Sequence, residues 1–184
     1  LKMRTPGLGG EVLTKMGGTV VNMPAGEIFT ALQTGAIDAT EWIGPYNDLA
    51  LGLHKASKYY YTPGWQEPNV TFELDVNLKA WETLPDDLKA IVRAAARDVN
   101  GDMLDDYNAK NMEALEQLRE QGVEVRRLPD EVLSRLKEVA AEVVDASANA
   151  DPVAAKVWEQ QSAYLKRLYE YAELNEKDIY NIRG

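Results

Sequence analysis

The chain has 184 residues, a formal net charge of −10 at pH 7 and no cysteine. The lack of cysteine excludes thiolate catalysis and cysteine-based zinc sites. The acidic balance, with no cluster of Lys and Arg, argues against a surface for nucleic acid or anionic membranes. The apolar runs are much shorter than the roughly 18 residues of a membrane span. An anion bound by this chain must therefore be held by a specific arginine or by a bound cation.

The first sixty residues alternate short strands and short helices. We expect strands at 1–4, 19–21 and 37–42, and helices at 11–16, at 27–34 and after Gly44-Pro45. This alternation indicates βαβ units on a mostly parallel sheet, so the fold class is α/β. Because Leu1 to Arg4 reads as the interior of a strand, we expect the chain to be truncated. A signal peptide and an N-terminal lobe would then lie upstream.

The remaining two thirds of the chain are mainly helical. Strand-like segments at 57–61 and 70–78 flank a Pro63-Gly64 turn. A helix of some 35 residues, about 50 Å long, is expected from Pro85 to Gly122. The rest is expected to form a strand at 123–125, a helix at 129–148 and a helix from 151 with Val157, Trp158, Tyr164, Leu165 and Leu168 facing inward.

The usual enzyme motifs are absent. The chain has a single histidine, His54, which is expected in a helical segment beside Lys55. This excludes a histidine-dependent triad and a metal site with two histidines. There is no Gly-x-Ser-x-Gly elbow and no phosphate-binding loop. Gly7, Gly9 and Gly10 follow a strand but miss the dinucleotide-binding spacing, so we interpret them as a tight turn. No enzyme class gains support from these motifs.

Two candidate binding groups end predicted strands. Arg4 is placed where ligands collect in α/β folds, at the carboxyl edge of the sheet, and its guanidinium can grip a carboxylate with two hydrogen bonds. Glu41 can ligate a hard cation, and Trp42 can shield the site from water. From position alone, the simpler interpretation of Arg4 is a surface or ion-paired arginine. The simpler interpretation of Trp42 is a core residue at a strand end, beside a solvated Glu41.

Further candidates lie on less regular segments. Asn47 and Asp48 can contribute amide or carboxylate contacts, or can be polar residues in the first turn of a helix, which we favour for Asp48. Glu67, before Pro68, lies on an irregular segment of the kind that often holds ligands, although it can also be a solvent-exposed loop residue. One arginine and two glutamates together could hold a carboxylate anion and a metal ion.

Four stretches resemble a known family. Residues 2–11, 24–39, 40–48 and 61–68 are similar to solute-binding proteins of tripartite ATP-independent periplasmic (TRAP) transporters. The Glu-Trp pair at 41–42 and the Pro-Gly-Trp-Gln-Glu-Pro run at 63–68 resemble the branch that binds 2-oxo acids such as pyruvate, or lactate. The resemblance implies the C-terminal portion of a two-lobed periplasmic binding protein fold. Its implied parts are an α/β ligand-binding lobe (1–62), strands crossing the hinge toward an N-terminal lobe (63–84), a long lobe-spanning helix (85–122), and a short strand with C-terminal helices (123–184).

The resemblance also implies a function, which is capture without chemistry. Arg4 would bind the carboxylate of a small 2-oxo or 2-hydroxy monocarboxylate. Glu41, the backbone carbonyl of Trp42 and Glu67 would bind Na⁺ or Ca²⁺, while the Trp42 ring and Asn47 would contact the ligand. The implied protein is periplasmic, delivers its ligand to the TRAP membrane permease, has no nucleic-acid partner, and can form a homodimer through its C-terminal helices.

Two other functions are compatible with parts of the sequence. A metal-dependent pyruvate lyase or aldolase also suits an arginine beside a carboxylate-bound metal, but no histidine or lysine base lies near these motifs. A purely structural helical module accounts for the last hundred residues. It does not account for Arg4, Glu41 or Glu67.

Overall fold

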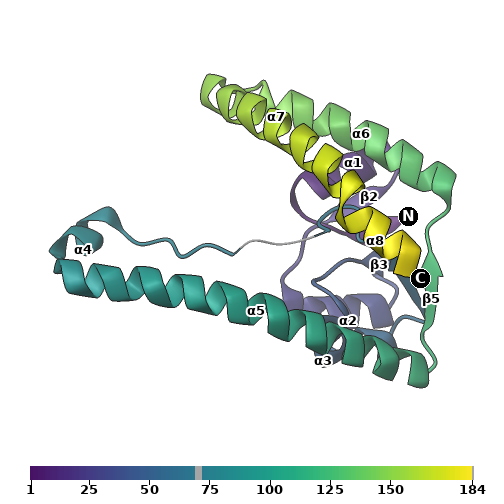
Figure 1. Cartoon of the computed structure of the whole chain (residues 1–184). Helices are drawn as coiled ribbons and strands as arrows, with labels where there is room; N and C mark the ends of the chain where they lie inside the picture. The colour runs from purple at the N-terminus through teal and green to yellow at the C-terminus, as the bar shows by residue number, and fades with distance from the viewer. Residues whose placement is uncertain (69–71, 184) are drawn as a thin grey trace. The chain divides into compact units, whose positions relative to one another are not determined.

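The computed structural model describes residues 1–68 and 72–183, which divide into two compact units, Leu1–Leu136 and Lys137–Gly184. The first unit opens with the expected alternation of strands and helices (Figure 1). Its first elements are β1 (Lys2–Arg4), α1 (Gly7–Lys15), β2 (Thr19–Val21), α2 (Ala25–Gln33), β3 (Ala39–Thr40), α3 (Pro45–Ala50), the 3₁₀ turn η1 (Leu53–Lys55) and β4 (Tyr59–Thr62). The later elements are α4 (Leu78–Thr83), α5 (Asp86–Glu120), β5 (Glu124–Arg127), α6 (Asp130–Ala148), α7 (Pro152–Leu174) and α8 (Glu176–Arg183). The α/β prediction is confirmed.

The first three strands form a parallel sheet in the order β2-β1-β3. Arg4, at the end of β1, lies opposite Val21 of β2 and Thr40 of β3. The chain moves to one side of β1 through α1 and to the other side through α2, and Figure 1 shows these helices on opposite sides of the strands. The reversal creates a switch point between the carboxyl ends of β1 and β3, where ligands bind in open α/β sheets. Arg4 lies at this point.

The glycines after β1 do more than make a turn. The helix α1 begins at Gly7, four residues before the expected start at Glu11. A Cβ atom on Gly10 would lie 2.7 Å from the carbonyl oxygen of Thr5 and 3.3 Å from Cγ1 of Val20. Glycine is therefore required at position 10, because the first turn of α1 packs closely on the sheet. The interpretation of Gly7, Gly9 and Gly10 as a tight turn was wrong, because all three belong to α1.

The core around the sheet is formed by apolar side chains of α1 and α2 and of the segment just before β3. Ile28 of α2 and Ile37 are almost fully buried, and Val12 and Leu13 of α1 are also buried. Burial of side chains of this size stabilises the fold by about 1.5–3 kcal/mol each. This core fixes the position of the sheet edge that carries Arg4.

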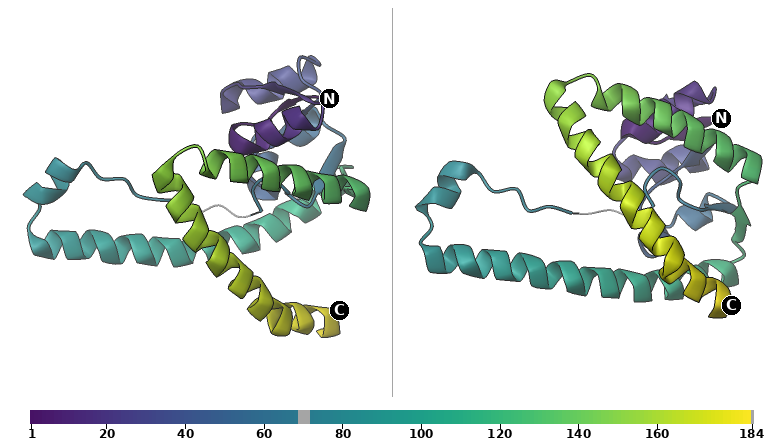
Figure 2. Two further views of the ribbon diagram at one scale, coloured as in Figure 1. Left: turned by 90° about the horizontal axis from the view of Figure 1, so that it is seen from above. Right: turned by 45° about the horizontal axis from the view of Figure 1, so that its top comes forward.

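A second pair of parallel strands joins distant parts of the first unit. The strand β4 pairs with β5, with Tyr59 opposite Glu124. The connection between them includes α5, which runs as one continuous helix (Figure 2). It ends just before Gly122, which has a φ of +86°, the left-handed conformation that favours glycine. The predicted long helix is confirmed, and α5 returns the chain to the side of β4.

The prediction of strands across 63–84 needs correction. Residues 72–77 form no strand, and Leu78 begins helix α4; the expected strand also included 69–71, which lie outside the described residues. Phe72, Leu74 and Val76 alternate as in a strand, yet all three are exposed. An alternating segment becomes a strand only when a neighbouring strand pairs with it. The described part of the chain places no such strand beside 72–77.

The C-terminal helices differ in how much of their apolar surface is buried. In α6, Leu136, Val139 and Val143 share one face at helical spacing and are buried. In α7, Val157, Tyr164 and Leu168 are exposed, so the expectation that they face inward was wrong. An apolar helix face is buried only where another element covers it. Among the described residues, none of the helices is both long and apolar enough to cross a membrane.

The start of α7 offers a simple test of the C-terminal unit. The Asp151 carboxylate accepts hydrogen bonds from the backbone N–H groups of Val153 (2.8 Å) and Ala154 (3.0 Å). Because Asp151→Ala leaves these donors without the cap, we expect it to lower the free energy of unfolding by about 1 kcal/mol. Asp151→Asn retains an oxygen acceptor and is the matched control. Thermal unfolding followed by circular dichroism would measure both; an equal loss in the two variants would contradict the capping role.

Candidate functional site

Arg4 and Glu41 form a buried ion pair at the switch point. Nη1 of Arg4 donates to Oε1 of Glu41 at 2.6 Å and to the backbone carbonyl of Glu41 at 3.3 Å. Only 11% of the Arg4 side chain and 9% of the Glu41 side chain are exposed. The backbone also joins them, since the N–H of Glu41 donates to the carbonyl of Arg4 at 3.2 Å. The two residues that end β1 and follow β3 are thus brought together as the sequence predicts.

The guanidinium of Arg4 retains unused hydrogen-bonding capacity. Its Nε atom is buried and has no hydrogen-bond partner among the described residues. Its Cζ atom lies 5.4 Å from the centroid of the Trp42 ring, within the range of a cation–π contact. A buried donor without a partner is costly, and a carboxylate ligand would satisfy it. Arg4 is therefore held in place by Glu41 and Trp42 with a donor still available.

The electrostatics around Glu41 favour a cation. Burial raises the pKa of Glu41, Arg4 opposes this shift, and the negative charges of Glu67 and Asp48 add to it. The negative charges of Glu67 and Asp48 thus both act on Glu41, whose own ion-pair partner is Arg4. A bound cation would relieve this repulsion. Within the described residues, no three His, Asp or Glu side chains gather as a metal cluster, so a cation here needs backbone or amide oxygens as well.

The segment that carries Glu67 lies against the start of α1. A Cβ atom on Gly9 would lie 3.2 Å from Cβ of Gln66, so the two residues are in close contact. The segment therefore passes beside the start of α1, and the negative charge of Glu67 acts on Glu41. Glu67 itself is exposed. Its side chain is therefore open to a ligand, and within residues 1–68 and 72–183 no hydrogen bond or ion pair engages it.

Asn47 lies on the short helix that follows Glu41 and Trp42. Its position in α3 matches the alternative that it belongs to the first turn of a helix. Its Oδ1 atom is nevertheless buried and has no hydrogen-bond partner among the described residues. Asn47 therefore has an acceptor to offer.

Asp48 and Tyr60 form a polar contact that the sequence did not predict. The Tyr60 hydroxyl donates to Oδ2 of Asp48 at 2.6 Å, and the N–H of Ile43 donates to Oδ1 at 3.3 Å. Burial raises the pKa of Asp48, and burial together with the Asp48 charge raises the pKa of Tyr60 far above its usual range. From the sequence, the tyrosine run at 59–61 predicts only a strand whose side chains alternate between two faces. The one signal for this contact was that Tyr60 points to the opposite face from its two neighbours.

The contact predicts a stability effect. Tyr60→Phe leaves one oxygen of a buried carboxylate without its donor, so we expect the free energy of unfolding to fall by about 1–3 kcal/mol. Urea denaturation followed by circular dichroism measures this change. Tyr59→Phe, at the exposed neighbouring residue, is the matched control and should be close to neutral. Equal effects of the two substitutions would show that the Tyr60 hydroxyl is not important for stability.

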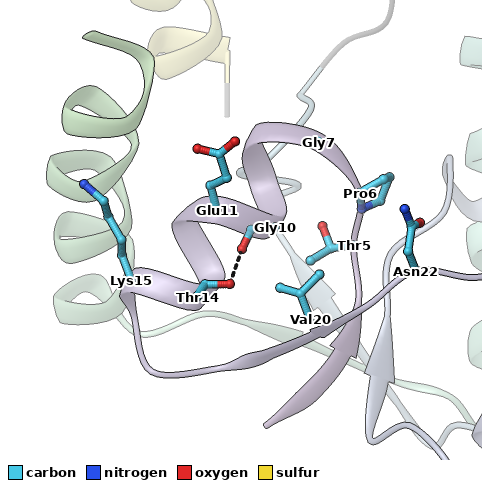
Figure 3. Close-up of a pocket in the computed structure, with 9 residues that line it drawn as sticks. All are labelled: Thr5, Pro6, Gly7, Gly10, Glu11, Thr14, Lys15, Val20 and Asn22. Atoms are coloured by element: carbon cyan, nitrogen blue, oxygen red, sulfur yellow. Dashed lines mark hydrogen bonds between the residues drawn. The ribbon is translucent and has the colours of Figure 1, made fainter. Parts of the chain in front are cut away.

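A separate hollow lies on the other side of β1, between α1 and β2 (Figure 3). It encloses about 430 Å³ and is lined by Thr5, Pro6, Gly7, Gly10, Glu11, Thr14, Lys15, Val20 and Asn22. None of the residues predicted to bind ligand or metal lines it. The Thr14 hydroxyl is already bonded to the carbonyl of Gly10 at 2.9 Å. The hollow is therefore distinct from the Arg4 site.

Comparisons with known proteins agree with this geometry. Bacterial extracellular solute-binding protein, family 7 (DctP), matches residues 1–151. A monocarboxylate 2-oxoacid-binding periplasmic protein from Nostoc sp. is 40% identical over 181 residues, which is 98% of this chain and 50% of that protein. The chain thus spans about half the length of the curated relative it matches.

Solved structures give the same result. A TRAP periplasmic solute-binding protein from Colwellia psychrerythraea, with bound calcium and pyruvate, has a TM-score of 0.92 and 35% identity, over 98% of this chain and 56% of that one. One from Pseudoalteromonas atlantica, with bound sodium and pyruvate, has a TM-score of 0.87 and 34% identity, over 98% and 55%. The family match over residues 1–151 and the 40% identity to the Nostoc protein identify the chain as a member of the DctP family of bacterial extracellular solute-binding proteins, family 7.

Proposed function

We propose that this chain forms part of the periplasmic solute-binding subunit of a TRAP transporter, which captures a small 2-oxo or 2-hydroxy monocarboxylate, such as pyruvate, together with a cation. The observation that carries the proposal is the arrangement at the switch point. A buried arginine with an available donor lies there beside Glu41, and the charge of Glu67 acts on Glu41. This arrangement suits an anion and a cation bound side by side.

Each site residue has a distinct role in this proposal. Arg4 binds the ligand carboxylate, and the Trp42 ring shields it from water. Glu41, the backbone carbonyl of Trp42 and Glu67 hold the cation, because hard cations take oxygen ligands. The cation supplies positive charge that offsets the two glutamates and attracts the second oxygen of the ligand. Asn47 offers its buried, unpaired oxygen to the ligand or to a bridging water.

The relatives support this choice of ligand and cation. Calcium with pyruvate and sodium with pyruvate are bound in two of the similar structures. Calcium with picolinate is bound in a third, from Bordetella bronchiseptica, with a TM-score of 0.91 and 33% identity. Picolinate, like pyruvate, has a second donor atom beside its carboxylate. In each ligand, the carboxylate and this second atom can together chelate one cation. The lyase or aldolase alternative gains no support from these relatives.

We extend the proposal to location and partners. The protein acts in the periplasm and delivers its ligand to the TRAP membrane permease. It can also form a homodimer through its C-terminal helices, because α7 and α8 expose many large apolar side chains and the Bordetella protein is described as a dimer. Sedimentation of the full-length protein would test this; a monomer at micromolar concentration would contradict it.

Intrinsic tryptophan fluorescence tests the proposed capture. The protein, in the longest form that its gene encodes, is titrated with pyruvate in chelator, in Na⁺ and in Ca²⁺. We expect saturable binding that requires one of the cations. Propionate is the matched control, because it keeps the carboxylate but lacks the 2-oxo oxygen, and we expect it to bind much more weakly. If pyruvate, lactate and longer 2-oxo acids all fail to bind, the proposal is wrong.

A further inference from the structure

The short helix α3 receives its N-terminal hydrogen bond from a distant helix. Its N-cap residue is Gly44, which has no side chain, and its first residue is Pro45, which has no N–H. The first N–H in the helix is that of Tyr46, and it donates to Oδ1 of Asn111 at 3.0 Å. Asn111 belongs to α5, 65 positions further along the chain. A side chain from α5 thus replaces the missing local cap of α3.

The contact between Asn111 and this turn is close. A Cβ atom on Gly44 would lie 3.2 Å from Oδ1 of Asn111. The backbone of Gly44 is extended, with a φ of 169°, so it does not itself require glycine. A Cβ atom at position 44 would press on Asn111, which would have to shift by a few tenths of an ångström to make room. The bare backbone lets the Asn111 amide reach the N–H of Tyr46.

Neighbouring side chains on α5 hold Tyr46 as well. The rings of Tyr46 and Tyr107 meet edge to face, with centroids 6.0 Å apart and planes at 83°. The Nζ atom of Lys110 lies 5.1 Å from the centroid of the Tyr46 ring. Tyr107, Lys110 and Asn111 are spaced as neighbours on one helix face. Together with the hydrogen bond, they fix the start of α3 on one turn of α5.

We propose that Asn111 is a positioning residue for the ligand site. It anchors the segment 41–48, which carries Glu41, Trp42 and Asn47, on α5. The proposal rests on the proposed function, because those three residues are its cation and ligand groups. Asn111 touches neither ligand nor cation; it sets where the segment that does so is held.

The test compares two substitutions at one position in the full-length protein. Asn111→Leu keeps the approximate size and removes the acceptor, whereas Asn111→Asp keeps an oxygen acceptor for the Tyr46 N–H. Asn108→Leu is the matched control, since Asn108 is an exposed asparagine on the same helix. Two quantities are measured in each variant: hydrogen exchange of the Tyr46 amide without ligand, and pyruvate affinity at saturating Ca²⁺.

Asn111→Leu removes the hydrogen bond from the Tyr46 N–H, so we expect exchange of the Tyr46 amide to become about tenfold faster. Because the segment that carries the site residues is then held less firmly, we expect pyruvate binding to weaken by about fivefold. Asn111→Asp should restore both toward wild type, and Asn108→Leu should change neither. Unchanged exchange in Asn111→Leu, or faster exchange with unchanged affinity, would overturn the positioning role. Failure of the wild type to bind pyruvate would instead overturn the proposed function, and amide exchange would still decide whether Asn111 is the anchor.

Gly44→Ala tests the same contact from the other side. The added methyl group should push Asn111 away and speed exchange of the Tyr46 amide in the wild-type background. Combined with Asn111→Ala, which clears the space, the same substitution should cause little further change. An equal effect of Gly44→Ala in both backgrounds would show that Asn111 is not what requires glycine here.

Discussion

Replacing Arg4 with lysine is expected to weaken pyruvate binding by about 100-fold or more while the fold persists. Lysine keeps the positive charge and can still pair with Glu41. It cannot offer the planar fork, in which one edge serves Glu41 while another donor serves the ligand. A loss of this size corresponds to about 2.7 kcal/mol of binding free energy. Titration calorimetry at saturating Ca²⁺ would measure it, with circular dichroism confirming the fold.

Two further variants make the Arg4 result specific. Arg97→Lys, at an exposed arginine on α5, makes the same chemical change away from the site and should leave affinity unchanged. Arg4→Ala should lose binding and also stability, because it leaves the buried Glu41 carboxylate without its partner. If Arg4→Lys bound pyruvate as the wild type does, Arg4 would serve only as the ion-pair partner of Glu41. An ion-paired arginine without a role in binding is the alternative that the sequence leaves open for Arg4.

Local signals in the sequence were enough to locate Arg4 and Glu41. Each ends or follows a short strand bounded by glycine or proline, and parallel strands bring their carboxyl ends to one edge. The start of α1 was missed because glycines read as a turn. Gly10 is there for close packing, and packing distances are not visible in a linear pattern. The exposed faces of 72–77 and α7 were misjudged because periodicity shows which side chains share a face, but not what covers that face.

Long-range polar contacts could not have been predicted from one sequence. Asp48 is predicted to be a first-turn residue of a helix, and it is one, yet it is buried and bonded to Tyr60 of strand β4. Asn111 sits in the middle of a long helix, where asparagine carries no local signal. Its partner is an N–H group 65 positions away. Such contacts depend on how elements pack, so only the folded chain reveals that Asn111 and Gly44 belong together.

Glu67→Gln is expected to weaken cation binding by about tenfold or more without lowering stability. Glu67 is exposed and its charge acts on Glu41, so it can act on a cation there at little structural cost. Glutamine keeps the shape but removes the charge, and hard cations favour charged oxygen ligands. Calcium titration by calorimetry would give the affinity. Glu73→Gln, at another exposed glutamate, is the matched control and should be neutral.

Glu41→Gln should behave differently, and the contrast tests the site as a unit. It removes a charged cation ligand and also the ion-pair partner of the buried Arg4, so both cation affinity and the free energy of unfolding should fall. The charge of Glu67 raises the pKa of Glu41, so Glu67→Gln should move that pKa downward, which NMR titration of the cation-free protein can follow. A cation held by both carboxylates also requires strong non-additivity in the double variant. If the two substitutions instead add independently and neither changes the calcium dependence of pyruvate binding, the cation does not bind between them.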